Sequence, residues 1–516
     1  MSPLLLMLLL LGIVLGPTAS NALARRISLL GERVVSEQSI PSVLTYASYL
    51  GGPANEWAFN AAADPSGALY LVGRIGVADP PCWLGGGGGS ADVLVSKIAA
   101  DGSLVWSKTL GGTGDDVGYA VAYDPTGHVL VTGCTESANF PVTPGAAQPT
   151  YGGGASDGFV TKLRAADGTL VWSTFAGGAG DEQVNGIVVA TDGTVSIHSH
   201  TSSPDLPTLG AFQPAYGGGV SDSFVARYTS AGVLIWRSFL GGDGEELSAG
   251  IALDRTGALY VTGRTKSSNF PTRNALQSTF GGVDDGFVVK IAPAGNELVW
   301  STFLGGESSD LSRAIAVDET GRVAVAGWTR STRFPVKNPL QSALSGPTPN
   351  FDGFVALIAP DGTLLWSTYF GGGPTVAPPA AGHDRFRGVA ISGDGVSVVG
   401  YTESTSYRTL NAIQANAAGV GNERHDLVIT QIGLDGSLKF STYLGGSAND
   451  QAYGIIDLGG QLAIAGGTAS TDFPTAQPKQ PSNGGGEDVV IAILKPGRLV
   501  LDRSSFIPIS GVNMVR

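Results

Sequence analysis

Charge, and basic charge in particular, is scarce in this chain. Charged residues are 14% of the 516 positions and hydrophobic residues 42%, so the chain can form a core and is not intrinsically disordered. The formal net charge is −13. This excess of acidic residues argues against nucleic acid as a partner, because phosphate binding needs clustered lysine and arginine.

Cysteine is scarcer still, with two residues, Cys82 and Cys134. An oxidising, extracytoplasmic compartment permits a disulfide between them. Because the count is even, we predict a Cys82–Cys134 disulfide that ties the loop of the first repeat to the second repeat. The spacing alone does not show that the two Cα atoms come within bonding range.

Long apolar runs are almost absent. One run, Leu4 to Leu15, has the length of the apolar region of a signal peptide, and the small residues after it end in Ala22-Leu23-Ala24, an A-x-A cleavage pattern. The run is short for a membrane span. We therefore predict a signal peptide at residues 1–24, a secreted or cell-surface location and no transmembrane segment.

Glycine, in contrast, is abundant, with 77 residues. A Gly-Gly pair recurs at intervals of 60 to 74 residues, at positions 51–52, 111–112, 177–178, 241–242, 305–306, 371–372 and 445–446. A fixed period of this kind is the signature of a repeat architecture. The glycines follow no three-residue period and accompany short β-branched and aromatic runs, so they indicate an all-β protein.

Each period contains four short strand candidates. In the second period these are residues 118–123, 129–132, 159–163 and 170–175, here called strands a, b, c and d, with Asp-Gly-type turns after a and c. Such meanders bury both faces when they are stacked radially. We predict a seven-bladed β-propeller with four antiparallel strands per blade over residues 44–496. A linker (25–43) would precede it, and a tail or extra outer strand (497–516) would follow.

The ring needs a seventh strand d, because the array contains six. Residues 45–52 carry the Gly-Gly and an aromatic residue, so we expect this N-terminal strand to close the ring; residues 499–506 are the competing candidate. One position of strand d is aromatic in every copy, which predicts packing between blades. Its occupants are Tyr46, Trp106, Trp172, Trp236, Trp300, Trp366 and Phe440.

Four motifs recur along the chain: W-S-T-x-x-G-G, G-I-A-x-D-x-x-G, V-T-G-x-T-x-S-x-x-F-P and D-x-F-V-x-K. They are clear at residues 300–306, 250–254, 261–271 and 285–290. This pattern resembles the bacterial seven-bladed β-propeller repeat (SBBP). The resemblance implies an exported or surface-associated protein, and it supplies no catalytic motif. Blade 1 departs from the pattern after Gly73.

Two acidic positions are filled in all seven copies. One begins strand c: Asp92, Asp157, Asp222, Asp285, Asp352, Asp426 and Asp488. The other precedes strand a: Glu56, Asp116, Glu182, Glu246, Asp310, Asp384 and Asp450. We expect both acidic rings near the top face, where the d–a and b–c loops emerge, and a negative potential there. Structural hydrogen bonds to loop N–H groups are the favoured role. Calcium binding is the alternative, without a D-x-D-x-D-G loop, and no other metal or cofactor is predicted.

Function is expected where the copies differ. The residue that follows the glycine of strand b, or Ser199 in blade 3, varies between blades, and its occupants include residue types that are common in recognition patches: Arg74, Cys134, His200, Arg264, Trp328, Tyr401 and Gly467. We name five of these as top-face binding candidates: Arg74, His200, Arg264, Trp328 and Tyr401. Free drift at solvent-facing positions stays open as the alternative.

Blade 6 adds three candidates, His383, Arg385 and His425, of which the first two follow an insertion in its d–a loop. Two hypotheses follow. The first is a monomeric binding or scaffold module that presents top-face loops to a glycan, a cell-surface component or a protein. The second is an extracytoplasmic polysaccharide lyase or hydrolase with a site in the central top pocket, although no catalytic motif is present.

Overall fold

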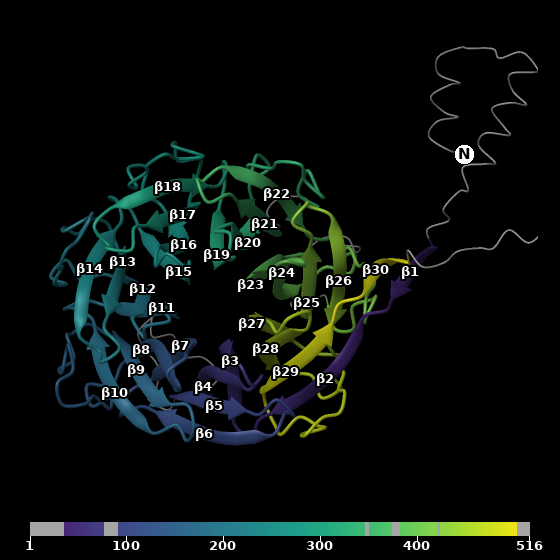
Figure 1. The fold of residues 1–516 in the computed structure, drawn as a ribbon, viewed down its shortest axis with the longest axis horizontal. Helices are drawn as coiled ribbons and strands as arrows, with labels where there is room; N and C mark the ends of the chain where they lie inside the picture. The colour runs from purple at the N-terminus through teal and green to yellow at the C-terminus, as the bar shows by residue number, and fades with distance from the viewer. Residues whose placement is uncertain (1–35, 77–90, 346–349, 374–381, 421–423, 503–516) are drawn as a thin grey trace, which may run out of the picture. The chain divides into compact units, whose positions relative to one another are not determined.

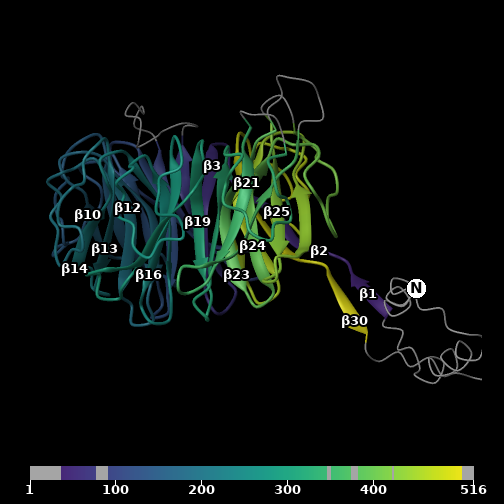
Figure 2. The ribbon, with the colours of Figure 1, turned by 90° about the horizontal axis from the view of Figure 1, so that it is seen from above.

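Seven four-stranded antiparallel sheets form a ring around a central channel (Figure 1). The computed structural model describes residues 36–76, 91–345, 350–373, 382–420 and 424–502. Within each blade the chain moves outward from an innermost to an outermost strand, and Figure 2 shows the strands running from one face of the disk to the other. The fold is the predicted seven-bladed β-propeller.

The blades follow one another along the chain. Blades 1 to 3 contain β3 (Asn55–Ala63), β4 (Leu69–Gly76), β5 (Asp92–Ile98) and β6 (Leu104–Leu110); β7 (Asp116–Asp124), β8 (His128–Thr135), β9 (Asp157–Arg164) and β10 (Leu170–Ala176); and β11 (Glu182–Val189), β12 (Val195–Thr201), β13 (Asp222–Tyr228) and β14 (Leu234–Leu240). Blades 4 and 5 contain β15 (Glu246–Leu253), β16 (Leu259–Thr265), β17 (Asp285–Ile291) and β18 (Leu298–Leu304); and β19 (Asp310–Val317), β20 (Val323–Thr329), β21 (Asp352–Ile358) and β22 (Leu364–Phe370). Blade 6 contains β23 (Asp384–Ser392), β24 (Gly395–Thr402), β25 (Asp426–Ile432) and β26 (Leu438–Leu444).

Blade 7 joins the two ends of the propeller. Its strands β27 (Asp450–Asp457), β28 (Leu462–Thr468) and β29 (Asp488–Lys495) are completed by β2 (Val43–Leu50), which pairs with β29 from Val43↔Lys495 to Leu50↔Val489. The N-terminal strand therefore closes the ring, as predicted. The competing segment starts within β30 (Arg498–Asp502), which pairs with β1 (Ser36–Ile40) in a separate two-stranded ribbon.

The aromatic position of strand d lies at the boundary between blades. The indole Nε1 of Trp300 in blade 4 donates to the Pro360 carbonyl in the c–d turn of blade 5, at 3.1 Å. Trp106, Trp172 and Trp366 make the same contact to the next blade, at 3.0 to 3.2 Å. Each of these rings therefore packs against a neighbouring blade and also hydrogen-bonds to it.

Several sequence predictions fall outside the described residues, namely the signal peptide (1–24), most of the linker (25–43) and the tail beyond residue 502. In the ranges that the structure describes, no helix is long and apolar enough to cross a membrane.

Replacing Trp300 should test the inter-blade role of the aromatic position. Trp300 is 2% exposed, so Trp300→Ala should lower the free energy of unfolding by about 3–5 kcal/mol. Trp300→Phe should cost less, because phenylalanine occupies this position in blade 6 as Phe440. Thermal and urea denaturation of both variants would measure this, and equal stability of Trp300→Ala and wild type would contradict the assignment.

Candidate functional site

The two acidic rings lie at the start of strands c and a and are almost entirely buried. Thirteen of the fourteen carboxylic residues are at most 5% exposed, and Asp92 is intermediate. The strand-a residue of every blade accepts a hydrogen bond from the second glycine of the Gly-Gly pair, as Glu182 does from Gly178 N at 2.8 Å. In blades 2 to 7 the strand-c aspartate accepts from a loop N–H, as Asp222 does from Gly217 at 2.6 Å.

These contacts explain why Gly-Gly recurs. A Cβ atom on Gly241 would lie 2.5 Å from Glu246 Oε2 and 2.6 Å from Asp222 Cγ, so the two carboxyl groups leave no room for a side chain. Because the carboxyl groups face inward to the backbone, they give the top face little of the open negative surface that we expected. In the described part of the chain, no three His, Cys, Asp or Glu side chains are placed to hold a metal ion, and calcium binding stays untested.

Burial shifts the titration of these rings. It raises the pKa of Glu182, Asp222, Asp285 and Asp450 to about 7 and that of Asp157 and Asp310 to about 6, against the pull of their hydrogen-bond donors. The two carboxyl groups at one Gly-Gly pair also repel each other, as Glu246 and Asp222 do. The rings are therefore partly protonated near neutral pH.

The variable position of strand b is less exposed than expected. His200 is 3% exposed, with Nδ1 lying 3.1 Å from Ser248 Oγ in the next blade, and Arg74 is 7% exposed. Arg264 is half-buried and forms ion pairs with Glu245 and Asp284 at 2.9 and 3.4 Å. These three residues are thus held within the protein and do not form a free top-face surface.

Trp328 and Tyr401 are the two display candidates that come together. They lie at the top of blades 5 and 6, together with Arg385, whose guanidinium carbon is 5.6 Å from the Trp328 ring centroid and 5.8 Å from that of Tyr401. Arg385 Nη1 also donates to Tyr401 Oη at 2.9 Å. The structure therefore gathers part of the predicted site at one boundary between blades.

The histidines do not form a shared centre. His383 lies against Phe351 of blade 5, with ring centroids 5.2 Å apart, while the His425 ring is tilted against Tyr401, with centroids 4.6 Å apart, and contacts Gln451 of blade 7. Burial and the nearby Arg385 and Arg330 lower the pKa of His383 to about 4. Burial lowers the pKa of His198 and of His200 to about 3. These three imidazoles are neutral at physiological pH.

A β-bulge interrupts every innermost strand near its third to fifth residue. Bulges redirect side chains and are common beside active sites. Here one bulge residue of each blade lines the channel, and the residue type varies between blades: Phe59, Tyr119, Asn185, Ala249, Arg313, Arg387 and Tyr453. This ring of bulge residues was not selected from the sequence.

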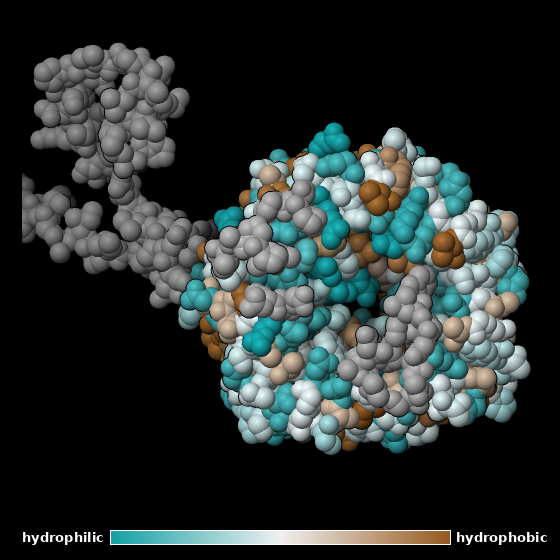
Figure 3. Space-filling model, turned by 180° about the vertical axis from the view of Figure 1, so that it is seen from behind, coloured by the Kyte–Doolittle hydropathy of each residue, from teal (hydrophilic) through white to brown (hydrophobic). Residues whose placement is uncertain are grey.

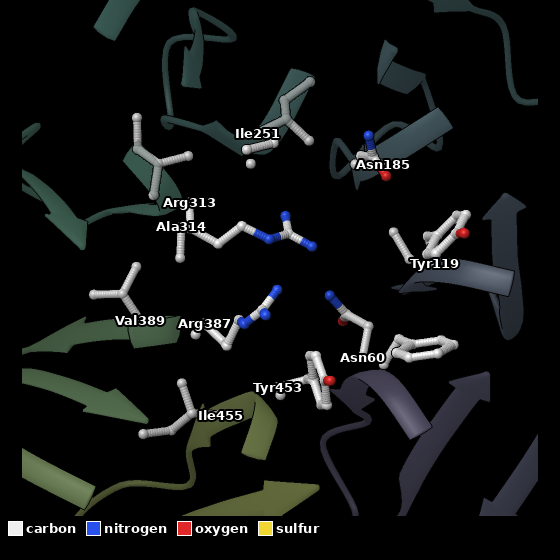
Figure 4. Close-up of a pocket in the computed structure, with 18 of the residues that line it drawn as sticks. Asn60, Tyr119, Asn185, Ile251, Arg313, Ala314, Arg387, Val389, Tyr453 and Ile455 are labelled. Carbon is white, nitrogen blue, oxygen red and sulfur yellow. The ribbon is translucent and has the colours of Figure 1, made fainter. Parts of the chain in front are cut away.

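The bulge residues line a cavity of about 210 Å³ within the channel. Figure 4 shows the guanidinium groups of Arg313 and Arg387 pointing into its middle, where the Asn60 amide meets them. Phe59 forms an aromatic cluster with Tyr119 and Tyr453, with centroid distances of 5.7 and 5.4 Å. The cavity thus combines two cations from neighbouring blades with aromatic rings, and none of the described residues that line it is acidic.

The two cations of the cavity have no carboxylate partner within 4 Å among the described residues. Burial and the charge of Arg387 lower the pKa of Arg313 to about 10. Both guanidinium groups are therefore charged at neutral pH, and neither charge is neutralised by a carboxylate of the described residues. Burial raises the pKa of Tyr119 to about 12, so this phenol stays protonated.

Aromatic rings support Arg387 in place of a carboxylate. Its guanidinium carbon is 5.1 Å from the Trp328 ring centroid, 5.4 Å from Tyr453 and 5.5 Å from Tyr401. Cation–π contacts hold a guanidinium group in place without cancelling its charge. The charge therefore remains available to a ligand in the channel.

The same comparison of copies that selected Trp328 and Tyr401 would have found the bulge ring. Its members stand three residues after the strand-a acidic position in every copy, as Arg313 does after Asp310. The sequence carries no sign of the bulge itself, so the direction of these side chains is hidden in it. The predicted Cys82–Cys134 disulfide stays a prediction, because Cys82 lies outside the described residues.

Several solved structures are similar to this chain at low sequence identity. The WD40 β-propeller domain of Doa1 matches at 11% identity and a TM-score of 0.43, over 89% of this chain and 97% of that one. BamB from Moraxella catarrhalis matches at 11% identity and a TM-score of 0.37, over 89% of this chain and 100% of that one. The quinohemoprotein alcohol dehydrogenase from Comamonas testosteroni matches at 11% identity and a TM-score of 0.40, over 88% of this chain and 76% of that one. No family model and no curated protein matches the chain, so the SBBP resemblance stays a prediction.

The acidic rings predict an unusual dependence of stability on pH. Their folded pKa values of about 6 to 7 exceed the unfolded values of about 4. Their contribution to stability is thus complete below about pH 4 and is lost as the pH rises towards 7. The buried neutral histidines have the opposite effect, because they lower the stability of the folded protein as the pH falls below about 6.5. They are fewer than the carboxyl groups of the rings.

We therefore expect a higher Tm at pH 5.5 than at pH 8, measured by calorimetry. Glu182→Gln should flatten this slope, because it replaces a titrating group by a neutral one that can still accept from Gly178. An unchanged or lower Tm at pH 5.5 would contradict the shifts.

The cation pair should be costly when no ligand neutralises it. Arg313→Gln removes a buried charge whose pKa is depressed to about 10, so it should raise the free energy of unfolding at pH 7 by about 1–3 kcal/mol. Arg255→Gln is the control, since Arg255 is 69% exposed in an ion pair with Glu319 and its loss should change stability by less than about 0.5 kcal/mol. Destabilisation by Arg313→Gln would show that the pair is satisfied internally.

Proposed function

We propose that this propeller is an exported binding module that takes one acidic group of its ligand, a carboxylate, phosphate or sulfate, between Arg313 and Arg387 in the central channel. The single observation that carries the proposal is this pair of guanidinium groups, which converge in a cavity whose described lining residues include no acid (Figure 4). Export is supported by the apolar run and cleavage pattern at residues 4–24.

The chemistry of the cavity suits an anion. A guanidinium group offers N–H donors in a planar fork that matches the two oxygens of an acidic group. Burial strengthens such a contact, because the effective dielectric constant of the interior is lower than that of water. The Asn60 amide makes no hydrogen bond to another described residue, so it can supply a further donor or acceptor.

The arrangement favours binding over catalysis. Tyr119 is protonated, since its pKa is about 12, and no acidic side chain is among the described residues of the cavity wall, so these residues offer neither a Tyr119 phenolate nor a carboxylate base. His383 and His425, the residues named for the enzymatic alternative, lie at different borders of blade 6. The cavity thus supplies the groups that hold an anion.

Titration calorimetry with glucuronate, inorganic phosphate and sulfate tests the proposal, with glucose as the neutral control. At least one anion should bind, and Arg313→Gln or Arg387→Gln should each weaken it about 10- to 100-fold, because a hydrogen bond to a charged group contributes about 1.5–3 kcal/mol. Arg255→Gln should bind like wild type. Equal affinity in all variants, or no binding of any anion, would contradict the proposal.

A further inference from the structure

The cation pair is the lower end of a longer arrangement that reaches the top of blades 5 and 6. Arg330 directly follows β20, and its guanidinium carbon is 3.8 Å from the Phe351 ring centroid. Arg385, the second residue of β23, lies 4.8 Å from the same ring. Phe351 thus has two arginines against it at the end of the strands, where the channel begins.

Further rings connect these arginines to the channel. Trp328 and Tyr401 contact both Arg385 and Arg387, at 5.1 to 5.8 Å. We call this set the arginine–aromatic stack: Arg330, Phe351, Arg385, Trp328, Tyr401 and Arg387. Arg385 is the second residue of β23 and Arg387 is its bulge residue, so the two arginines leave the strand at different depths. The stack therefore offers positive charge at successive depths from the strand ends to the cavity.

The stack carries charge without compensation. No carboxylate lies within 4 Å of Arg330 or Arg385 in the part of the chain that the structure covers. The Nε atoms of Arg330, Arg385 and Arg387 are buried and have no hydrogen-bond acceptor there. Other arginines of the top face, such as Arg264, are neutralised by ion pairs. Three neighbouring arginines thus lack a carboxylate partner in a protein that is acidic overall, and a ligand can supply the missing negative charge.

We infer that the ligand is a linear acidic oligosaccharide, with one uronate residue in the cavity and the next residues along the arginine–aromatic stack. This inference rests on the proposed function, because the cavity pair would hold the first carboxylate. A single small anion would use Arg313 and Arg387 and leave Arg330 and Arg385 without a partner. A chain with one carboxylate per residue engages cations at successive depths.

The walls of the cavity favour a sugar ring. Its volume of about 210 Å³ is below the roughly 300–1,000 Å³ of pockets for drug-sized ligands, which suits one ring better than a bulkier group. Phe59, Tyr119 and Tyr453 offer apolar aromatic surface beside the cations, and a uronate has both an apolar C–H face and a carboxylate. Figure 3 shows a hollow near the middle of one face of the propeller, with hydrophilic residues along part of its border.

Nucleic acid and acidic peptides are the competing polyanions. The net charge of −13 opposes nucleic acid, whose phosphates need many basic contacts. A polyglutamate chain has the carboxylates but no rings that fit between the aromatic side chains. Both serve as probes that distinguish a general polyanion site from a glycan site.

Titration with galacturonate and with tetragalacturonate tests the inference, with maltotetraose, tetraglutamate and a short single-stranded oligonucleotide as comparison ligands. The tetrasaccharide should bind at least 10-fold more tightly than the monosaccharide. Arg330→Gln and Arg385→Gln should each remove most of this gain, measured as the ratio of the affinities of the same variant for the tetrasaccharide and the monosaccharide. Arg385→Lys, which keeps the charge and loses the planar fork, should retain part of the gain, and Arg255→Gln should retain all of it.

The outcomes separate the two proposals. Equal affinity for the mono- and tetrasaccharide would overturn the inference while the anion site in the channel stands. Tight binding of tetraglutamate or the oligonucleotide would overturn the glycan class. If no acidic ligand binds the folded wild-type protein, the proposed function fails and the inference fails with it.

Discussion

A single four-stranded sheet with two apolar faces cannot bury both faces by itself, and the rest of this structure depends on that constraint. Each blade buries its faces against the blades before and after it, so the seven sheets must close into a ring. Closure requires β2 to complete blade 7 beside β29, which removes the one open boundary. Four tryptophans of strand d donate hydrogen bonds to the next blade, and the strand-a carboxyl group of each blade accepts a hydrogen bond from the Gly-Gly pair before it, as Glu182 does from Gly178.

Closure also creates the place where the copies are free to differ. The innermost strands converge on the channel, and there the bulges release one side chain per blade from packing between sheets. Framework positions repeat seven times because each junction is the same, whereas the bulge position tolerates arginine, asparagine and aromatic residues. Cation–π contacts from Trp328 and Tyr401 then allow Arg387 to stay charged beside Arg313. The repeated framework therefore fixes the positions of the channel residues, and the variable bulge residues determine the chemistry of the channel.

The fold could be predicted from the sequence in detail because it is written seven times. Blade number, strand order and N-terminal closure all follow from the spacing of the Gly-Gly pairs and the Tyr46 copy of the aromatic position. The binding role of the selected residues stays a prediction. The structure brings Trp328, Tyr401 and Arg385 together, whereas His200, Arg74 and also Tyr401 are buried.

Arg313 and Arg387 were missed for a physical reason. A bulge adds a residue to one strand without altering its composition, so the sequence does not show which side chain turns into the channel. Likewise, the acidic rings are plain in the sequence, whereas their burial depends on loops that fold back over them, as Gly217 does on Asp222. Repetition reveals the framework, but the orientation of a single side chain depends on three-dimensional packing.

The central claim is that an acidic group binds between two guanidinium groups of neighbouring blades. Crystals soaked in selenate test it most directly, because the anomalous signal of selenium locates the anion without reference to any assay. The account predicts an anomalous peak in the channel between Arg313 and Arg387, and its loss in crystals of Arg313→Gln. Selenate peaks confined to the outer surface, with none in the channel of the wild-type protein, would contradict it.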